Sequence, residues 1–240
     1  MVMQTLNETF YTKLEYHDEL NPKLWNDGVL DDDVKEHLLT IAYQWLDYAN
    51  IPLESIRDIV MTGGNANYNW TEWSDIDIHI LCKWDEMPIQ NSELMLDYLF
   101  AKKDLWKKKH NIRIKGYEVE IFAQPDDKAF PVGQGVYSLM HSKWVVKPEH
   151  ENLNFDASTQ LKRDIRDRLN KMRQIEKNPE AIEDAQSFVD QLRAARGESI
   201  NNEGEFGHDN LIFKSLRNRG ALDKFSKFIN KYRDSKLSLD

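Results

Sequence analysis

The chain reads VMTGGNANYNWTEWSDIDIHI from Val60 to Ile80. The apolar segment 56–62 ends at Gly63 and Gly64, which predicts a strand followed by a turn. After a polar loop (65–74), apolar and polar residues alternate from Asp75 to Ile80, and this period of two predicts a second strand. The stretch therefore predicts two strands, joined through a Gly-Gly turn and a loop.

The second strand carries two acidic residues on one face. Because side chains alternate along a strand, Asp75 and Asp77 point the same way, about 6.6 Å apart, while the isoleucines face the other side. Neighbouring carboxylates repel each other and resist desolvation unless a cation or several donors lie between them. A hard divalent cation such as Mg²⁺ meets that need, whereas the alternative is an ordinary solvated strand end.

Two other segments add to this pattern. Without side chains, Gly63 and Gly64 would let backbone N–H groups approach an anion, although an ordinary turn also explains them. Downstream, residues 117–122 (YEVEIF) predict a strand in which Glu118 and Glu120 share a face. Periodicity alone cannot choose between these two glutamates, and a solvated strand face is the alternative for both.

Together these features resemble the nucleotidyltransferase superfamily, which has the DNA polymerase β-like fold. The resemblance rests on the apolar strand, Gly63-Gly64, the ten-residue spacer (65–74), the Asp75-Ile76-Asp77-Ile78 strand and a later strand with Glu120. It covers about residues 55–125, and within the superfamily it is closest to the small uncharacterised nucleotidyltransferases of tailed bacteriophages. The C-terminal third is similar to that group only through Glu205-Phe206 and 210–214 (NLIFK).

The resemblance implies a chemistry. Asp75, Asp77 and Glu120 would be the catalytic residues and would bind two Mg²⁺ or Mn²⁺ ions, which stabilise the attacking and leaving oxygens during in-line displacement. The nucleotide-binding residues would be Gly63, Gly64 and Ser74, with Asn65 and Asn67 from a loop that contains no Lys or Arg.

The implied activity is transfer of a nucleoside monophosphate from a nucleoside triphosphate such as ATP, with release of pyrophosphate. The acceptor is unidentified and could be RNA, a protein or a small molecule. Two alternatives stay open: a catalytically silent nucleotide-binding protein of the same fold, and a toxin-like or second-messenger transferase. Many relatives have Ser where this chain has Gly64, so one hydroxyl contact to phosphate is missing.

The rest of the chain predicts an α+β protein with a mixed sheet flanked by helices, followed by a helical C-terminal region. Apolar spacing predicts a helix that follows Asp31-Asp32-Asp33 and ends before Pro52, a second helix over 92–109, and extended structure over 136–146. From Phe155 onward only helical patterns occur, one of them starting at Ala181, with a flexible loop expected over 197–207. We therefore expect a catalytic domain at 1–150 and a helical region at 151–240.

Composition bounds the function further. The 240 residues carry a formal net charge of −9. Residues 1–150 hold 25 acids and 15 bases, whereas 151–240 hold 16 acids and 17 bases. This acidity argues against a protein that coats nucleic acid non-specifically.

No apolar run approaches the roughly 20 residues of a membrane span, and a single cysteine fits a reducing compartment. We expect a cytoplasmic protein without a membrane partner, in the host cytoplasm if phage-encoded.

Two further features have ordinary structural explanations. His79 shares the face of Asp77, and we expect it to form a hydrogen bond within the sheet instead of acting in catalysis. The strongest basic run, Lys107 to Lys109, falls at the expected end of a helix, where positive charge is favourable in any case.

Overall fold

The structure is a computed structural model that describes residues 10–178 and 182–239. It divides into two compact units: Tyr16–Glu151, called the sheet unit here, and the helical unit, in which residues 10–15 join residues 152–178 and 182–239. The assignment of 1–150 to a catalytic domain stays a prediction. Residues 1–9 of that expected domain, and Ala181 at the expected start of a helix, lie outside the described residues.

The sheet unit is built on a six-stranded mixed sheet in the order β5-β6-β4-β3-β7-β8. β4 runs antiparallel to β3 and parallel to β6, and the other neighbouring pairs are antiparallel. The strands are β3 (Ile56–Thr62), β4 (Ile76–Cys82), β5 (Arg113–Ile114), β6 (Tyr117–Pro125), β7 (Val136–Ser138) and β8 (Lys143–Val146). A separate small hairpin consists of β1 (Trp25–Asn26) and β2 (Val29–Leu30).

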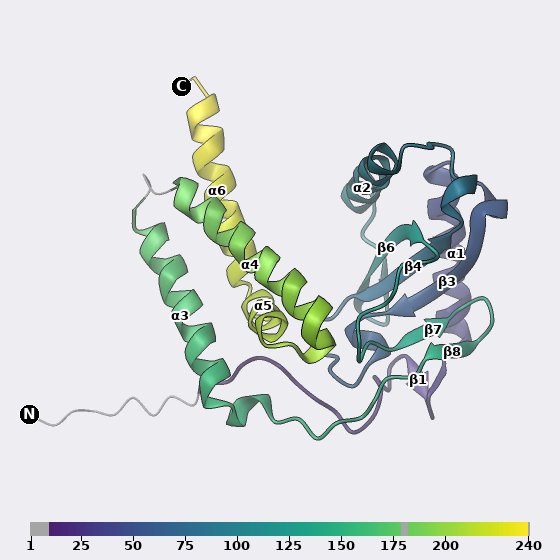
Figure 1. Cartoon of the computed structure of the whole chain (residues 1–240), viewed down its shortest axis with the longest axis horizontal. Coiled ribbons are helices and arrows are strands. Elements are labelled where there is room, and N and C mark those ends of the chain that lie inside the picture. Colours follow the sequence, from purple (N-terminus) through teal and green to yellow (C-terminus); the bar gives the residue numbers. More distant parts are fainter. Residues whose placement is uncertain (1–9, 179–181, 240) are drawn as a thin grey trace, which may run out of the picture. The chain divides into compact units, whose positions relative to one another are not determined.

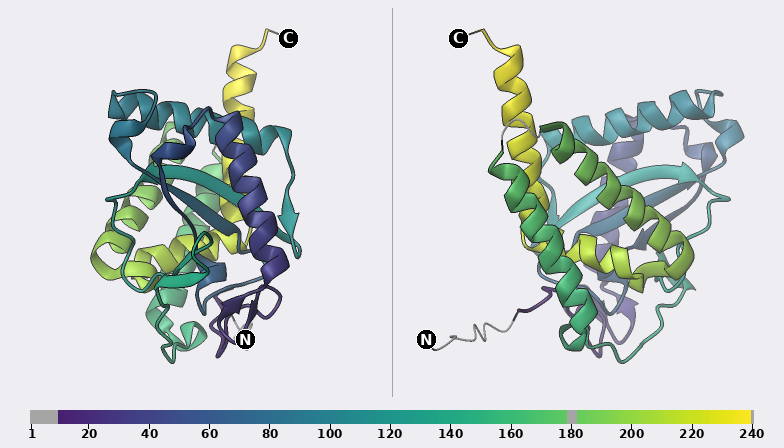
Figure 2. Two further views of the ribbon diagram at one scale, coloured as in Figure 1. Left: turned by 90° about the vertical axis from the view of Figure 1, so that its right-hand side faces the viewer. Right: turned by 60° about the vertical axis from the view of Figure 1, so that its left-hand side comes forward.

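Two helices flank the sheet, α1 (Asp32–Tyr48) and α2 (Ser92–Lys109), and Figure 2 shows α1 crossing it. Asp31 caps α1 by accepting a hydrogen bond from the Val34 N–H, and Asn91 caps α2 in the same way through the Leu94 N–H. Apolar side chains of both helices and of β4 form one core cluster, which includes Leu38, Trp45, Leu99 and Ile78.

The strand predictions around Gly63 and Gly64 are confirmed. β3 covers the predicted 56–62, and along β4 buried residues alternate with half-buried ones, as a period of two requires. Residues 136–146 are not one extended piece, because β7 and β8 pair as a hairpin.

The helical unit contains α3 (Thr159–Glu176), α4 (Ile182–Glu203), α5 (His208–Asn218) and α6 (Ala221–Leu237) (Figure 1). The flexible loop expected over 197–207 is wrong, because α4 continues to Glu203 and a 3₁₀ turn (Gly204–Phe206) follows. Gly197 costs a helix about 1 kcal/mol relative to Ala. The helix nevertheless continues through Gly197, since α4 packs against α5 and its Leu192 and Ser199 are buried.

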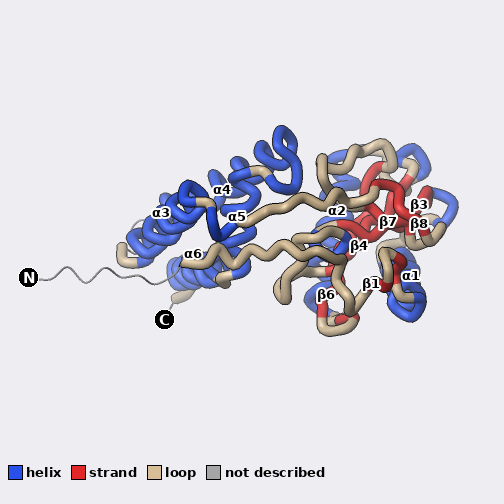
Figure 3. Tube along the Cα trace, turned by 90° about the horizontal axis from the view of Figure 1, so that it is seen from below, coloured by secondary structure: helices blue, strands red, loops and turns tan. Residues whose placement is uncertain are grey.

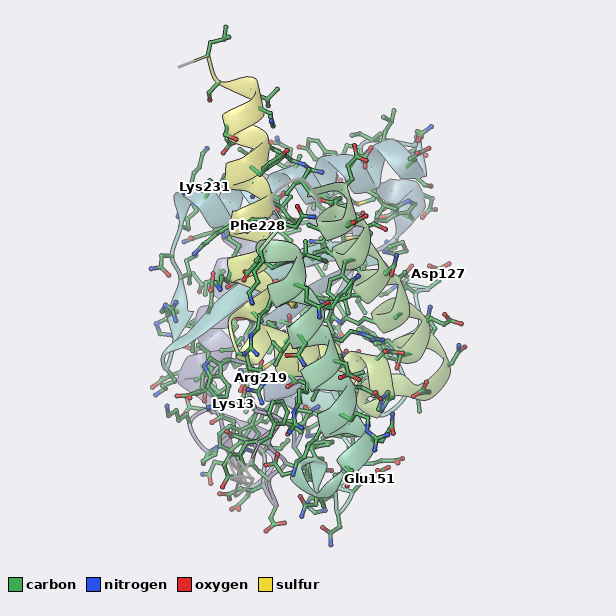
Figure 4. The ribbon with its side chains drawn as sticks, turned by 90° about the vertical axis from the view of Figure 1, so that its left-hand side faces the viewer. Lys13, Asp127, Glu151, Arg219, Phe228 and Lys231 are labelled. Atoms are coloured by element: carbon green, nitrogen blue, oxygen red, sulfur yellow. The ribbon has the colours of Figure 1, made fainter. Side chains whose placement is uncertain are left out.

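Residues 10–15 form part of the helical unit, because side chains at the end of α5 and of Arg219, which follows it, donate to their backbone carbonyls. Ser215 donates a hydrogen bond to the Thr12 carbonyl, Asn218 donates to that of Lys13 at 2.9 Å, and Arg219 donates to that of Tyr11. Figure 4 shows Lys13 and Arg219 near each other on this unit.

The α+β class is therefore confirmed: a mixed sheet flanked by helices, followed by a helical C-terminal region. Within the described chain, all strands belong to the sheet unit (Figure 3). None of the described helices combines the length and the apolar character that a membrane span requires.

Candidate functional site

The candidate site lies where three neighbouring strands bring Thr62, Asp77 and Glu120 into one row. In the register of the sheet, Asp77 of β4 is opposite Thr62 of β3 on one side and opposite Glu120 of β6 on the other. Register partners on adjacent strands share a face, so the carboxylates of Asp77 and Glu120 lie on the face opposite Ile76 and Ile78. Both isoleucines are fully buried, whereas Asp77 is half-buried.

Gly63 packs directly against Asp77. It follows the last residue of β3 and has φ 77°, a conformation that favours glycine. A Cβ at this position would lie 1.9 Å from Oδ2 of Asp77. Glycine is thus required both by the backbone conformation and by the close approach of the carboxylate.

Gly64 and Ser74, at opposite ends of the loop, are also neighbours. A Cβ on Gly64 would lie 3.0 Å from Oγ of Ser74. Ser74 is buried, and its Oγ accepts a hydrogen bond from the Thr71 N–H at 2.9 Å. The loop therefore folds back so that Ser74, Asp75 and Asp77 lie beside the Gly-Gly turn.

Asn65 fixes this loop from inside. Its side chain is fully buried; Nδ2 donates to the Asp75 carbonyl at 3.0 Å, and Oδ1 accepts from Asn21 at 2.8 Å. Trp25 donates to the Asn65 carbonyl at 2.7 Å. Since Asp75 immediately precedes β4, these bonds fix where β4 starts relative to the Gly-Gly turn.

Asn67 is equally buried. Its Nδ2 donates to the Gly133 carbonyl at 2.8 Å, and its Oδ1 accepts from the Tyr68 N–H at the same distance. The amides of Asn65 and Asn67 therefore bond to the protein itself. Their predicted contact with nucleotide stays untested, and these bonds favour a positioning role instead.

Glu120 is held by two lysines of α2. Its Oε2 lies 3.0 Å from the Lys103 ammonium and its Oε1 lies 2.5 Å from that of Lys107. Burial raises the pKa of Glu120, but the two ammonium groups outweigh it and lower this pKa to about 2. Glu120 is thus a carboxylate in the folded protein across the physiological range.

Glu118 has a different position. Pairing of β6 with β4 begins at Val119, whereas Glu118 is opposite Arg113 of β5. Of the two glutamates left open by periodicity, the register therefore places Glu120 opposite Asp77. Glu118 still contributes to the local field, because its carboxylate lies 3.5 Å from the Lys107 ammonium.

Asp75 lies just before β4 and is half-buried. Its charge acts on Lys107: burial lowers the pKa of that ammonium, but Glu120, Glu118 and Asp75 outweigh burial and raise it. Lys107 therefore lies within the field of three carboxylates from this face of the sheet.

His79 forms the hydrogen bond within the sheet that its position predicts. Its Nδ1 lies 2.7 Å from Oε1 of Gln124 on β6. Burial lowers the pKa of His79, which favours the neutral ring, although the bond to Gln124 acts in the opposite direction. His79 is therefore a structural residue beside the acidic row.

The donor set at this face has the chemistry that a divalent cation prefers. Carboxylate oxygens from Asp75, Asp77 and Glu120 are hard ligands for Mg²⁺ or Mn²⁺. The ammonium groups of two lysines already neutralise Glu120. Among residues 10–178 and 182–239, no three or more His, Cys, Asp or Glu side chains are grouped closely enough to hold a metal ion. The carboxylates fit a divalent cation chemically. To bind that cation, Glu120 would have to leave its two lysine partners.

Lys103 and Lys107 are the residues of this site that sequence reasoning missed. The run Lys107 to Lys109 lies at the end of a helix, as its position in the sequence predicts. The available signal was the spacing of four between Lys103 and Lys107, which puts both on one side of the helix that precedes the Glu120 strand.

Comparison with known proteins gives a solved structure of weak similarity. No family model matches the chain, and no curated protein matches its sequence. A c-di-GMP synthase from Capnocytophaga granulosa, the STING-associated CdnE, is 13% identical, with 86% of this chain and 83% of that chain covered and a TM-score of 0.23. A TM-score this low does not establish a common fold. No match links the chain to tailed bacteriophages, so that link stays a prediction.

Proposed function

We propose that the chain is a metal-dependent nucleotidyltransferase that transfers a nucleoside monophosphate from a nucleoside triphosphate to an acceptor. The observation that carries this proposal is the contact between Gly63 and Asp77. It puts a side-chain-free turn against a carboxylate that is itself opposite Glu120. Such an arrangement can present backbone N–H groups and carboxylate-bound cations to one polyphosphate.

In this proposal, Gly63 and Gly64 approach the phosphates through their backbone, and Asp75, Asp77 and Glu120 hold Mg²⁺ or Mn²⁺. The metal would supply charge neutralisation at the phosphates and a lower pKa for the attacking hydroxyl. An acceptor oxygen forms a bond to the α-phosphorus, and its proton is released to solvent. The bond from the α-phosphorus to the bridging oxygen breaks, and pyrophosphate leaves.

One observation favours a second candidate, a nucleotide-binding protein without turnover. Glu120 is compensated by two lysines, so one of the three expected metal ligands is engaged within the protein. Pyrophosphate release separates the two candidates, because a silent binding protein gives a nucleotide-dependent thermal shift but no pyrophosphate.

The test uses the whole chain with Mn²⁺, each α-labelled nucleoside triphosphate and a cell lysate as the source of acceptors. We expect label transfer and pyrophosphate release to fall at least about 100-fold in Asp75→Asn and Asp77→Asn. The matched control is Asp97→Asn, which removes an exposed carboxylate from α2 and should behave as the wild type. Transfer that persists in folded Asp75→Asn and Asp77→Asn proteins would overturn the proposal.

A further inference from the structure

The acidic face leaves a triphosphate short of positive charge. Three carboxylates, two divalent ions and a fully ionised triphosphate together retain about three negative charges. Enzymes that act on phosphoryl groups usually add Lys or Arg at this point. The loop 65–74, however, contains neither.

Two ammonium groups are nevertheless present at this face. Lys103 and Lys107 lie one turn apart on α2, and both reach the single carboxylate of Glu120. Lys107 also lies 3.5 Å from the carboxylate of Glu118, so the two ammonium groups are shared between two carboxylates of β6. The Lys107 side chain is 51% exposed, which leaves it access to a ligand in solution.

The small cavity beside Lys103 and Lys107 limits which part of a ligand can bind there. The cavity lined by Lys103, Trp106, Lys107, Glu118 and Glu120 has a volume of about 20 Å³, room for about one water molecule. A nucleoside cannot enter it. A ligand outside this cavity can still reach the exposed ammonium group of Lys107, which suits phosphate oxygens.

We propose that Lys103 and Lys107 form the polyphosphate-binding pair of this site and exchange partners when nucleotide binds. Without nucleotide they neutralise Glu120, and Lys107 also pairs with Glu118; with nucleotide they release these carboxylates and donate to oxygens of the β- and γ-phosphates. The inference rests on the proposed function for the identity of the nucleotide. It adds the residues that bind the phosphates and the competition between those lysines and a cation for Glu120.

The exchange predicts effects of opposite sign, which loss of a merely structural ion pair would not produce. In Lys103→Gln/Lys107→Gln, we expect affinity for a nucleoside triphosphate with Mn²⁺, and for inorganic tripolyphosphate with Mn²⁺, to fall at least tenfold. Affinity for Mn²⁺ alone should rise about threefold or more, because Glu120 no longer has competing cations. Isothermal titration calorimetry measures the polyphosphates, and electron paramagnetic resonance measures free Mn²⁺.

The matched control is Lys108→Gln/Lys109→Gln, which removes the same charge from the same helix end. Both of its residues are exposed, and the control should stay within twofold of the wild type in every titration. Lys103→Arg/Lys107→Arg keeps the charge and should restore polyphosphate binding to within about threefold. Thermal unfolding of each variant checks that it is folded.

The outcomes separate this inference from the proposed function. If the wild type binds nucleotide but the Gln pair binds it equally well, the inference is overturned and the proposed function stands. If the wild type binds tripolyphosphate through the lysines but no nucleoside triphosphate, the polyphosphate pair is supported and the proposed function fails. If Mn²⁺ affinity falls together with that for polyphosphate, or the wild type binds no polyphosphate, the lysine exchange is overturned.

Discussion

The backbone of Gly63 and the carboxylate of Asp77 occupy adjoining space: a Cβ on Gly63 would lie 1.9 Å from Oδ2 of Asp77. The turn that ends β3 and the acid on β4 are thus fitted to each other. A residue larger than glycine would move the carboxylate out of the row that it forms with Glu120.

Gly63→Ala should therefore change binding more than stability. Gly63 has φ 77° and ψ −163°, a backbone conformation almost confined to glycine, so an L-residue there costs about 1 to 3 kcal/mol, whereas the carboxylate end of Asp77 can rotate away. Gly28→Ala is the control, because Gly28 has the same φ of 77° but a Cβ added there would have nothing within 4 Å. We expect both variants to lose free energy of unfolding, measured by urea denaturation, and only Gly63→Ala to lose Mn²⁺-dependent nucleotide binding. Equal nucleotide binding by the two variants would show that the fit between Gly63 and Asp77 is unimportant.

Glu120 should contribute acid-sensitive stability. Its pKa is about 2 in the folded protein against an ordinary value of 4.5, so its contribution is fully present above about pH 4.5 and is lost as the pH falls toward 2. The upper limit is of the order of 3 kcal/mol, reduced by solvent screening because Lys107 is half exposed.

Urea denaturation of the wild type and Glu120→Gln across this range measures that contribution, as a difference in free energy of unfolding that shrinks with falling pH. Glu72→Gln, which removes an exposed carboxylate, is the control. A difference between the wild type and Glu120→Gln that does not change with pH would contradict the assignment.

His79 predicts a second, separate pH effect. Burial lowers its pKa below the ordinary value of 6.5, so its neutral form stabilises the fold above that pH, and the contribution falls as the pH drops from 6.5 through the folded pKa. The free energy of unfolding of the wild type should therefore fall between pH 7.5 and about pH 5.5, and His79→Gln should reduce the fall. His37→Gln, at an exposed histidine of α1, should leave it unchanged. Identical pH profiles for the wild type and His79→Gln would exclude this role.

Asp156 should hold residues 10–15 on the helical unit. It accepts hydrogen bonds from the Thr12 N–H at 2.6 Å and from the Thr12 hydroxyl at 2.9 Å, and Thr12 is fully buried. Asp156→Ala leaves both donors without that acceptor, at an expected cost of about 2 to 3 kcal/mol. Limited proteolysis should cleave residues 10–15 faster in this variant than in Asp167→Ala, where an exposed carboxylate of α3 is removed. Equal cleavage rates would contradict the role of Asp156.

The local features of this protein could be predicted from its amino-acid order. Alternation with a period of two located β4 and assigned Asp77 and Ile78 to opposite faces, because successive side chains of any strand point in opposite directions. The apolar segment ended by glycines located β3, and helical spacing located α1 and α2. Where spacing was weaker, as around Gly197, the expected loop was wrong because packing of α4 extended the helix.

Tertiary contacts decide which of these local features lie next to each other. The register of β4 with β6 placed Glu120 instead of Glu118 opposite Asp77, and folding of the loop brought Ser74 against Gly64. The position of α2 along β6 brought Lys103 and Lys107 to Glu120. Periodicity describes the direction of a side chain from its own element, whereas the partner of that side chain depends on strand pairing and helix packing between distant segments.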